Sequence, residues 1–213
     1  TQVEEQIKID PHLASAVGIV RALTSVISKS VATTLMGLRE ELEKEVNILK
    51  QSSPGNVTMS SGCDLFMQFV TRTSGLESSN FEETKRSLID RGEQFARRMN
   101  QSRDKIADLA APFITDDSVI LVHGYSRVVL AVLVQAARAG RNFHVMCTES
   151  RPDGAGFQMA QAILDSCKQL PGQQTPAVEV ISDAAVAAVM DQVSLVICGS
   201  EAIVENGGII NKV

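Results

Sequence analysis

The stretch that decides the fold of this chain is Leu195-Val196-Ile197-Cys198-Gly199-Ser200-Glu201. Its first four residues form a short apolar run that ends at a glycine, a pattern typical of a strand buried in a parallel sheet. Polar and glycine residues follow at 200–212, at the carboxyl end of this strand. Because open α/β sheets bind ligands at the carboxyl ends of their strands, the stretch predicts both a parallel sheet and the location of a ligand site.

The residues upstream of this stretch alternate between strand and helix patterns. The predicted strands are residues 119–123, 143–148, 178–182 and 195–199. The predicted helices between them are residues 128–139, 156–167 and 184–190. Repeated β-α-β units imply a parallel sheet with right-handed crossovers. Residues 113–213 are therefore predicted to form an α/β domain.

The first half of the chain has a helical period instead. Its apolar residues recur at three- and four-residue spacing, and they are Leu13, Val17, Val20, Leu23 and Ile27, then Leu35, Leu38, Leu42, Val46 and Leu49. A third helix is expected to open at the capping-box pattern Ser61-Gly62-Cys63-Asp64, and a long fourth helix is expected over residues 81–111, which Pro112 ends. Four such helices form an antiparallel bundle or layer. We therefore predict a helical domain over residues 1–112.

The composition is that of an ordinary globular protein. Of the 213 residues, 44% are hydrophobic and 21% are charged, and the formal net charge is −5. A net negative charge gives no general reason to expect nucleic acid as a partner. No apolar run approaches the roughly 20 residues that a membrane helix needs. We expect neither direct binding to nucleic acid nor a membrane partner.

The four cysteines show no CxxC pair and no zinc-ligand spacing with the three histidines. Cys147 and Cys198 fall in strands predicted to be buried, where cysteine behaves as a small apolar residue. This usage fits a reducing compartment, and we see no secretory signal. The sequence therefore predicts a cytoplasmic protein with no metal and no cofactor.

Polar side chains follow the predicted strands, at residues 123–127, 148–153, 183 and 201–212. Arg127, Arg151 and Lys212 would converge at one edge of a parallel sheet, where N–H groups at a helix start such as Ser126 add donors for an anionic phosphate. The alternative is that these residues are loop ends and helix caps. His123 is a general base in principle, although a histidine at a strand end is more often a packed residue. There is neither a GxGxxG turn nor a P-loop, so dinucleotide binding is not supported.

At these same residues the sequence resembles the family formed by the alpha subunits of eukaryotic translation initiation factor 2B. The matching segments are His123-Gly124-Tyr125-Ser126-Arg127-Val128-Val129-Leu130, Thr148-Glu149-Ser150-Arg151-Pro152-Asp153 and Glu205-Asn206-Gly207-Gly208-Ile209-Ile210-Asn211-Lys212. Further matches lie in the helical half, in residues 60–66, 91–93 and 102–109. The resemblance covers nearly the whole chain in the right order. It implies a helical N-terminal domain followed by a Rossmann-like domain.

The wider family includes isomerases that act on ribose 1,5-bisphosphate and methylthioribose 1-phosphate. The resemblance places Gly124 at the position of their catalytic cysteine and Glu201 at the position of their catalytic aspartate. A glycine supplies no thiol, so the isomerase reaction is not expected. The phosphate-side positions are kept, at Ser126, Arg127, Arg151, Asn211 and Lys212. Together with Glu201, they form a candidate site that would bind a sugar phosphate without converting it.

The resemblance implies a non-catalytic regulatory subunit of the guanine-nucleotide exchange factor for initiation factor 2. Its expected partners are a second copy of itself, the other subunits of initiation factor 2B and the phosphorylated alpha subunit of initiation factor 2. The alternatives are a sugar-phosphate isomerase and a stand-alone metabolite sensor of the same fold. Because the family continues beyond its Asn-Lys pair, the Rossmann-like domain is expected to be incomplete at Val213.

Overall fold

The computed structural model describes residues 16–52, 57–74, 80–168, 170, 172 and 175–211. Leu13 and Lys212, which the sequence singles out, lie outside the described residues. The chain divides into two compact units, Thr1–Gln101 and Ser102–Val213, and helix α5 (Phe81–Ala110) contributes residues to both. The predicted domain boundary at residues 112 and 113 stays a prediction. Across the described part of the chain, we find no helix with both the length and the apolar character needed to span a membrane.

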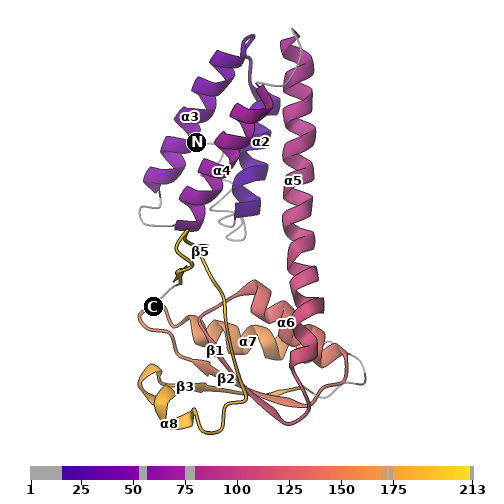
Figure 1. Ribbon diagram of the computed structural model, residues 1–213, viewed down its shortest axis with the longest axis vertical. Helices are drawn as coiled ribbons and strands as arrows, with labels where there is room; N and C mark the ends of the chain where they lie inside the picture. The colour runs from indigo at the N-terminus through magenta and orange to yellow at the C-terminus, as the bar shows by residue number, and fades with distance from the viewer. Residues whose placement is uncertain are drawn as a thin grey trace. The chain divides into compact units, whose positions relative to one another are not determined.

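The first unit is helical, as predicted. It contains α2 (Ala16–Lys29), α3 (Leu35–Ser52), α4 (Val57–Ser74) and the first part of α5. The predicted start of the third helix at Ser61 is wrong, because α4 already begins at Val57 and Ser61 lies inside it. Helices α2, α3 and α4 lie side by side (Figure 1). Helix α5 begins immediately after Asn80, whose side-chain Oδ1 accepts a hydrogen bond from the Glu82 N–H at 3.1 Å. This cap satisfies one of the free N–H groups at the helix start and fixes where α5 begins.

The core of the first unit is built from residues of the predicted helical period. Its buried members on α2 and α3 include the predicted Val20, Leu23, Ile27, Leu38, Leu42, Val46 and Leu49, and also Ile19 and Ala22, which the predicted pattern did not contain. Helix α4 adds Met59, Cys63, Phe66 and Val70, and α5 adds Leu88 and Ala96. Three- and four-residue spacing places such side chains on one face of a helix, so each helix turns one apolar stripe toward this common core.

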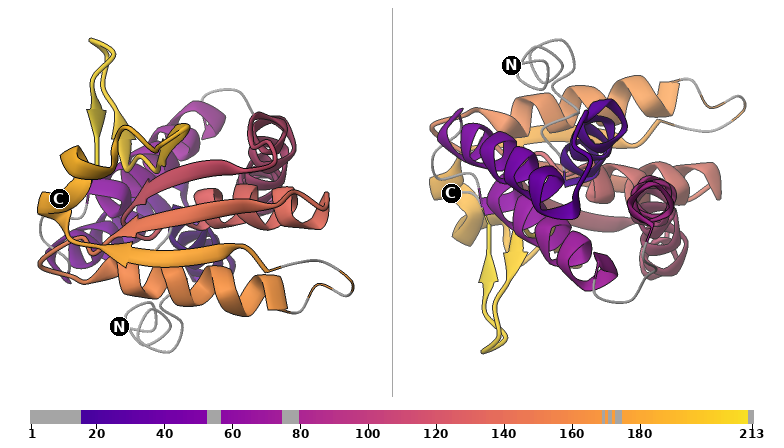
Figure 2. Two further views of the ribbon diagram at one scale, coloured as in Figure 1. Left: turned by 90° about the horizontal axis from the view of Figure 1, so that it is seen from below. Right: turned by 90° about the horizontal axis from the view of Figure 1, so that it is seen from above.

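The second unit contains a four-stranded parallel sheet. The strands are β1 (Ser118–His123), β2 (Phe143–Thr148), β3 (Ala177–Ile181) and β4 (Leu195–Cys198), in the order β3-β2-β1-β4. Figure 2 shows these strands lying side by side. The connections include the short helix η2 (Ala111–Phe113) before β1, α6 (Arg127–Arg138), α7 (Ala155–Lys168), η3 (Asp183–Ala185) and α8 (Val186–Val189). The prediction of an α/β fold with a parallel sheet is confirmed.

One face of the sheet packs against α6 and α7. Buried strand residues of this face are Ile120, Val122, Val145 and Cys147. They pack with Val129, Val132, Leu133 and Ala136 of α6 and with Met159, Ala160 and Ile163 of α7. The opposite face is mixed: it carries the buried Leu121 and Met146, and also His144, whose Nε2 lies 3.5 Å from Glu179 Oε1. Since side chains alternate along a strand, this division between the two faces follows directly from the sequence.

Two predictions about this unit are wrong. Strand β4 was expected to be buried, but Val196 is 49% exposed and Cys198 is also exposed. The reason is that β4 is at an edge of the described sheet, so only Leu195 and Ile197 pack against the core. The predicted helix 184–190 is also shorter in the structure, where it is the turn η3 followed by the four-residue helix α8.

Candidate functional site

The parallel register brings the carboxyl ends of the four strands together. His123 of β1 pairs with Cys198 of β4, and Thr148 of β2 pairs with Ile181 of β3. The turns that follow these strands therefore share one edge of the sheet. This edge holds the candidate ligand residues, and the hydrogen bonds there show what each of them does.

Ser150 is the centre of a polar network at this edge. Its side chain is buried, and its Oγ accepts a hydrogen bond from the Gly124 N–H at 2.8 Å. The same Oγ lies 3.1 Å from Thr148 Oγ1, which in turn lies 2.7 Å from His123 Nδ1. Ser150 has a φ of 57°, in the left-handed region that non-glycine residues rarely adopt. The network ties the turn after β1 to the turn after β2.

Asp183, just after β3, fixes the same loop from the other side. Its Oδ1 accepts a hydrogen bond from the Ser150 N–H at 2.8 Å, and its Oδ2 accepts one from the Arg151 N–H at 2.9 Å. These two backbone hydrogen bonds, with the nearby His123 and the Thr148 hydroxyl, hold the pKa of the Asp183 carboxyl below its ordinary value of 3.8. The carboxylate thus holds the loop that carries Arg151.

Replacing Asp183 with asparagine is expected to change how stability depends on acid. Because the folded-state pKa is lowered, ionised Asp183 adds stability that is fully present above the unfolded-state pKa near 3.8 and is lost as the pH falls through the lower folded-state value. The variant lacks this contribution, so its stability should fall less steeply below about pH 4. Urea denaturation at a series of pH values measures the difference.

The matched control is Asp165→Asn, because Asp165 accepts a hydrogen bond only from the exposed Gln161 side chain among the interactions of the described residues. This variant should retain the acid dependence of the parent chain. Equal acid slopes for the parent and Asp183→Asn would contradict the role given to Asp183.

Arg151 extends from this loop into solvent. Its Nε donates a hydrogen bond to Glu149 Oε2 at 3.0 Å, and its side chain is 66% exposed. The other carboxylate oxygen of Glu149 accepts a hydrogen bond from Ser182 Oγ at 3.2 Å. The Nε atom of Arg151 therefore orients its side chain. The two terminal guanidinium nitrogens have no partner within the described residues, and such paired N–H donors suit an anion.

Ser126 and Arg127 mark the start of α6. Ser126 is the N-cap, and its Oγ accepts a hydrogen bond from the Val129 N–H at 3.3 Å. A Cβ atom at Gly199 would lie 2.9 Å from this Oγ, so the turn after β4 approaches the cap closely. Arg127 lines a separate cavity of about 580 Å³, together with Arg103 of α5 and residues along α6. The described residues that line this cavity do not include Arg151, Glu201 or Asn211.

Glu201 and Asn211 lie on either side of a hairpin that the sequence analysis did not predict. Its strands are β5 (Ala202–Ile203) and β6 (Ile209–Ile210), and the Glu201 N–H donates to the Ile210 carbonyl oxygen at 2.9 Å. Glu201 is half-buried and Asn211 is exposed. The dipeptide Asn206-Gly207 is a recognised hairpin signal that would have predicted this turn, and Gly207 has a φ of 84°.

The described residues of the site do not form a metal centre. In the part of the chain that the structure describes, no group of three or more histidine, cysteine, aspartate or glutamate side chains is arranged to hold an ion. The edge is instead built of hydroxyls, backbone N–H groups bonded within the network, the carboxylates of Asp183 and Glu149, and the exposed Arg151 guanidinium. Of these groups, the Arg151 guanidinium is the donor that suits a phosphate or carboxylate oxygen.

The comparison with protein families identifies the chain. A model described as "Initiation factor 2 subunit family" matches residues 8–213. The chain belongs to this family. The resemblance found in the sequence motifs is therefore confirmed at the level of the family.

Two relatives in the initiation factor 2 subunit family match along nearly the whole chain. A protein of Dictyostelium discoideum named "Translation initiation factor eIF2B subunit alpha" is 45% identical over 99% of this chain. A Caenorhabditis elegans protein of the same name is 31% identical over 96% of it. The "Ribose 1,5-bisphosphate isomerase" of Methanocaldococcus jannaschii is 29% identical over 65% of the chain and 42% of its own length. The chain spans 63% and 65% of the two alpha subunits, so less than two thirds of each.

Solved structures share the fold. The Pyrococcus horikoshii translation initiation factor eIF-2B matches with a TM-score of 0.71 at 21% identity, over 97% of this chain and 67% of that one. A chain of the tetrameric eIF2B-beta2-delta2 complex from Chaetomium thermophilum matches with a TM-score of 0.72 at 20% identity, over 91% of this chain and 62% of that one. The sequence predicted a helical region followed by a Rossmann-like sheet, and these solved structures have the same fold.

The structure adds two residues, Ser150 and Asp183, to the candidate site. The predicted set contained Arg151 but neither Ser150 nor Asp183, although both lie in the turns after predicted strands. Their roles depend on a positive φ and on hydrogen bonds between turns far apart in sequence. The sequence signal that could have pointed to this role was Asp183, which directly follows the predicted strand 178–182.

Proposed function

We propose that this chain is part of a non-catalytic regulatory subunit of the guanine-nucleotide exchange factor for translation initiation factor 2. The observation that carries the proposal is the 45% identity to the Dictyostelium alpha subunit over 99% of the chain. This match extends through both compact units, whereas the isomerase match covers 65% of the chain. The proposal therefore assigns the helical unit and the α/β unit to one regulatory protein, acting in the cytoplasm.

The proposal includes two interactions. The full-length protein forms a homodimer that bridges the two halves of the exchange factor, in contact with the other four subunits. Its helical unit takes part in sensing phosphorylation of the alpha subunit of initiation factor 2. A phosphate group adds about −1.5 to −2 charges, so it changes binding by pairing with basic groups or by repelling acidic ones. These partners rest on the family resemblance.

The strand ends are proposed to bind a sugar phosphate without converting it. The proposed residues are Ser126, Arg127, Arg151, Glu201, Asn211 and Lys212. The supporting observation is the exposed Arg151 guanidinium on a loop that Asp183 and Ser150 hold in place. A charged donor on a fixed loop loses less conformational entropy when it binds an anion than one on a free loop.

A sugar-phosphate isomerase is the second candidate, because an isomerase is among the relatives. The end of β1 argues against it. Gly124, at the position that the resemblance gives to the catalytic cysteine, has a φ of 69° and no side chain. An added Cβ meets no atom within 4 Å, so a cysteine fits there, although the left-handed conformation costs about 1–2 kcal/mol.

The two candidates separate in an assay for turnover of ribose 1,5-bisphosphate. The full-length parent is expected to show none, and a double variant Gly124→Cys with Glu201→Asp tests whether the scaffold regains it. Turnover by the double variant alone marks the parent as a binder on an enzyme scaffold. Turnover by the parent would overturn the non-catalytic role.

Association with the other subunits tests the proposed role itself. The full-length protein, tagged and purified from cytosol, is expected to recover the other four exchange-factor subunits in stoichiometric amounts. Recovery of a lone homodimer would contradict the regulatory proposal. A rise in its melting temperature with sugar phosphate, and no subunit associated, would then favour a stand-alone metabolite sensor.

A further inference from the structure

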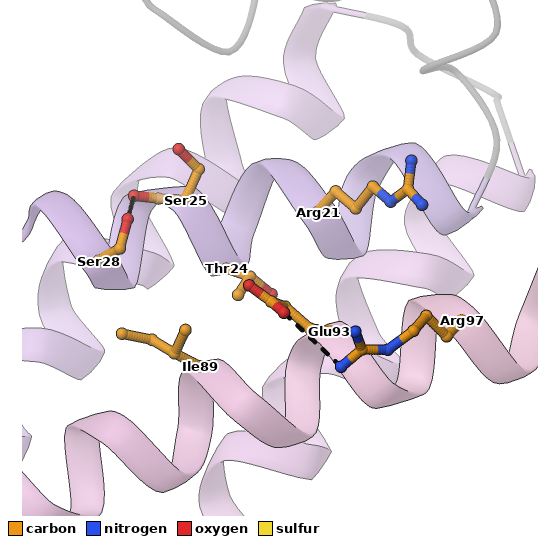
Figure 3. A pocket seen from close by; sticks show the side chains of 7 residues that line it. All are labelled: Arg21, Thr24, Ser25, Ser28, Ile89, Glu93 and Arg97. Carbon is orange, nitrogen blue, oxygen red and sulfur yellow. Dashed lines mark hydrogen bonds and ion pairs between the residues drawn. The ribbon is translucent and has the colours of Figure 1, made fainter.

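A pocket of about 490 Å³ lies between α2 and α5, within the helical unit. Figure 3 shows the two helices running in opposite directions along it, with Arg21 and Arg97 toward one end and Ser28 and Ile89 toward the other. Ile89 is the one apolar side chain among its described lining residues. The other six described lining residues carry a hydroxyl, guanidinium or carboxylate group, and these groups can bond to a polar ligand.

The pocket exists because small residues face each other across the two helices. Thr24 is buried, and a Cβ atom at Gly92 would lie 2.5 Å from its Oγ1, so the helices approach closely at this point. Toward the Ser28 end of the pocket, α2 presents only the short side chains of Ser25 and Ser28. Neither is long enough to fill the space, and the pocket stays open with hydroxyl groups on one wall.

The hydrogen bonds show which of these groups are available to a ligand. The hydroxyl of Thr24 donates to the Val20 carbonyl oxygen at 2.7 Å, and that of Ser28 donates to the Ser25 carbonyl oxygen at 2.8 Å. The Ser25 hydroxyl and the Arg21 guanidinium have no partner among the residues that the structure describes. Two hydroxyl protons are therefore already used, while one hydroxyl and one guanidinium can donate to a ligand.

Arg97 is held only weakly on the other wall. Its Nη2 lies 3.7 Å from Glu93 Oε2, and the two side chains are 63% and 57% exposed. An exposed ion pair of this length contributes little stability, so an anion can recruit Arg97 at small cost. With two arginines and one glutamate, the pocket keeps a net positive charge.

We propose that the α2–α5 pocket binds a phosphate monoester, with the guanidinium groups of Arg21 and Arg97 and the Ser25 hydroxyl as donors. Guanidinium groups present paired N–H donors that match phosphate oxygens, and a hydroxyl adds a single donor. The site is separate from the strand ends of the second unit, since no lining residue is shared. It deepens the proposed part of the helical unit in sensing a phosphorylated protein and rests on that proposal for its biological ligand, and it holds whether or not Arg151 binds a sugar phosphate.

The test is an NMR titration of the full chain, labelled with nitrogen-15, with N-acetyl-O-phosphoserine amide. The expected result is a saturable change in the amide signals around Arg21, Ser25 and Arg97, with none from the unphosphorylated amide. Arg21→Ala and Arg97→Ala should each weaken binding about tenfold. Arg39→Ala is the matched control, because Arg39 forms a comparable exposed pair with Glu43 on α3, and it should leave binding unchanged.

Two further variants make the outcome specific. Glu93→Gln should tighten binding about two- to threefold, because it removes a negative charge from the pocket and releases Arg97. Arg151→Ala should leave the titration unchanged, so failure here is distinguishable from failure of the sugar-phosphate site. Ribose 5-phosphate is titrated in parallel. The ratio of the two dissociation constants shows whether the pocket prefers a phosphorylated side chain or a free sugar phosphate, and either preference supports a monoester site. Equal changes with the unphosphorylated amide, or binding that survives in both arginine variants, would overturn the proposal.

Discussion

Replacing Gly156 with alanine is expected to lower the free energy of unfolding by about 3 kcal/mol or more. Gly156 is buried in the first turn of α7, directly over the end of β2. A Cβ atom there would lie 1.7 Å from the Thr148 carbonyl oxygen and 3.1 Å from the Glu149 Cα. Because both contacts are with backbone, no side-chain rotation relieves them, and either α7 or the end of β2 has to move.

The displacement should also reach the candidate site, because the moving segment continues into Ser150 and Arg151. Urea denaturation measures the loss of stability. Gly37→Ala is the matched control, since Gly37 also lies in the first turn of a helix but its added Cβ would lie 3.3 Å from Thr34 Oγ1, a side-chain contact that a shift of a few tenths of an ångström relieves. That variant should change stability by no more than about 1 kcal/mol. A similar loss in both variants would contradict the close packing of α7 on β2.

Replacing Arg151 with alanine is expected to weaken ribose 5-phosphate binding by the full-length protein about 10- to 100-fold. The estimate follows from the loss of one hydrogen-bonding interaction between charged groups, worth about 1.5–3 kcal/mol. The prediction rests on the proposed sugar-phosphate site, in which Arg151 is the exposed guanidinium on the loop after β2. Isothermal titration calorimetry measures the change in the dissociation constant.

Arg141→Ala is the control for this variant. Arg141 is an exposed arginine of the same unit, and it forms an ion pair with Asp116 at 3.3 Å. Arg141 precedes β2, whereas Arg151 follows it, so the two arginines lie at opposite ends of this strand. It should bind ribose 5-phosphate as the parent does. Undiminished binding by Arg151→Ala would remove Arg151 from the proposed site, and equal losses in both variants would indicate nonspecific attraction to positive charge.

The hydrophobic pattern predicted the elements well where burial follows a simple period. Strand β2 has the predicted bounds, and α5 ends one residue before the predicted end. The pattern could not show that β4 lies at an edge of the described sheet, because an apolar run is the same in a central strand and in an edge strand. That is why the burial of Cys198 was predicted wrongly. Only the pairing of strands, which is a tertiary property, decides it.

The candidate site was harder to predict than the fold. Parallel topology alone brought the turns after β1, β2 and β3 to one edge, so placing Arg151 there required no structural knowledge. The part played by Ser150 and Asp183 depends on side-chain hydrogen bonds that join residues 26 and 33 positions apart. The pocket at Arg21 and Arg97 likewise depends on the close approach of Thr24 and Gly92. Such contacts follow from packing and are not visible in the order of the residues.

The regulatory role is tested most directly by measuring nucleotide exchange on initiation factor 2 with a phosphorylated alpha subunit. The exchange factor is assembled from purified subunits with and without the full-length protein. We predict that the complete complex is inhibited by the phosphorylated substrate, and that the complex without this subunit exchanges nucleotide on phosphorylated and unmodified substrate at similar rates. Equal inhibition of both complexes would contradict the proposal that this protein takes part in sensing the phosphate.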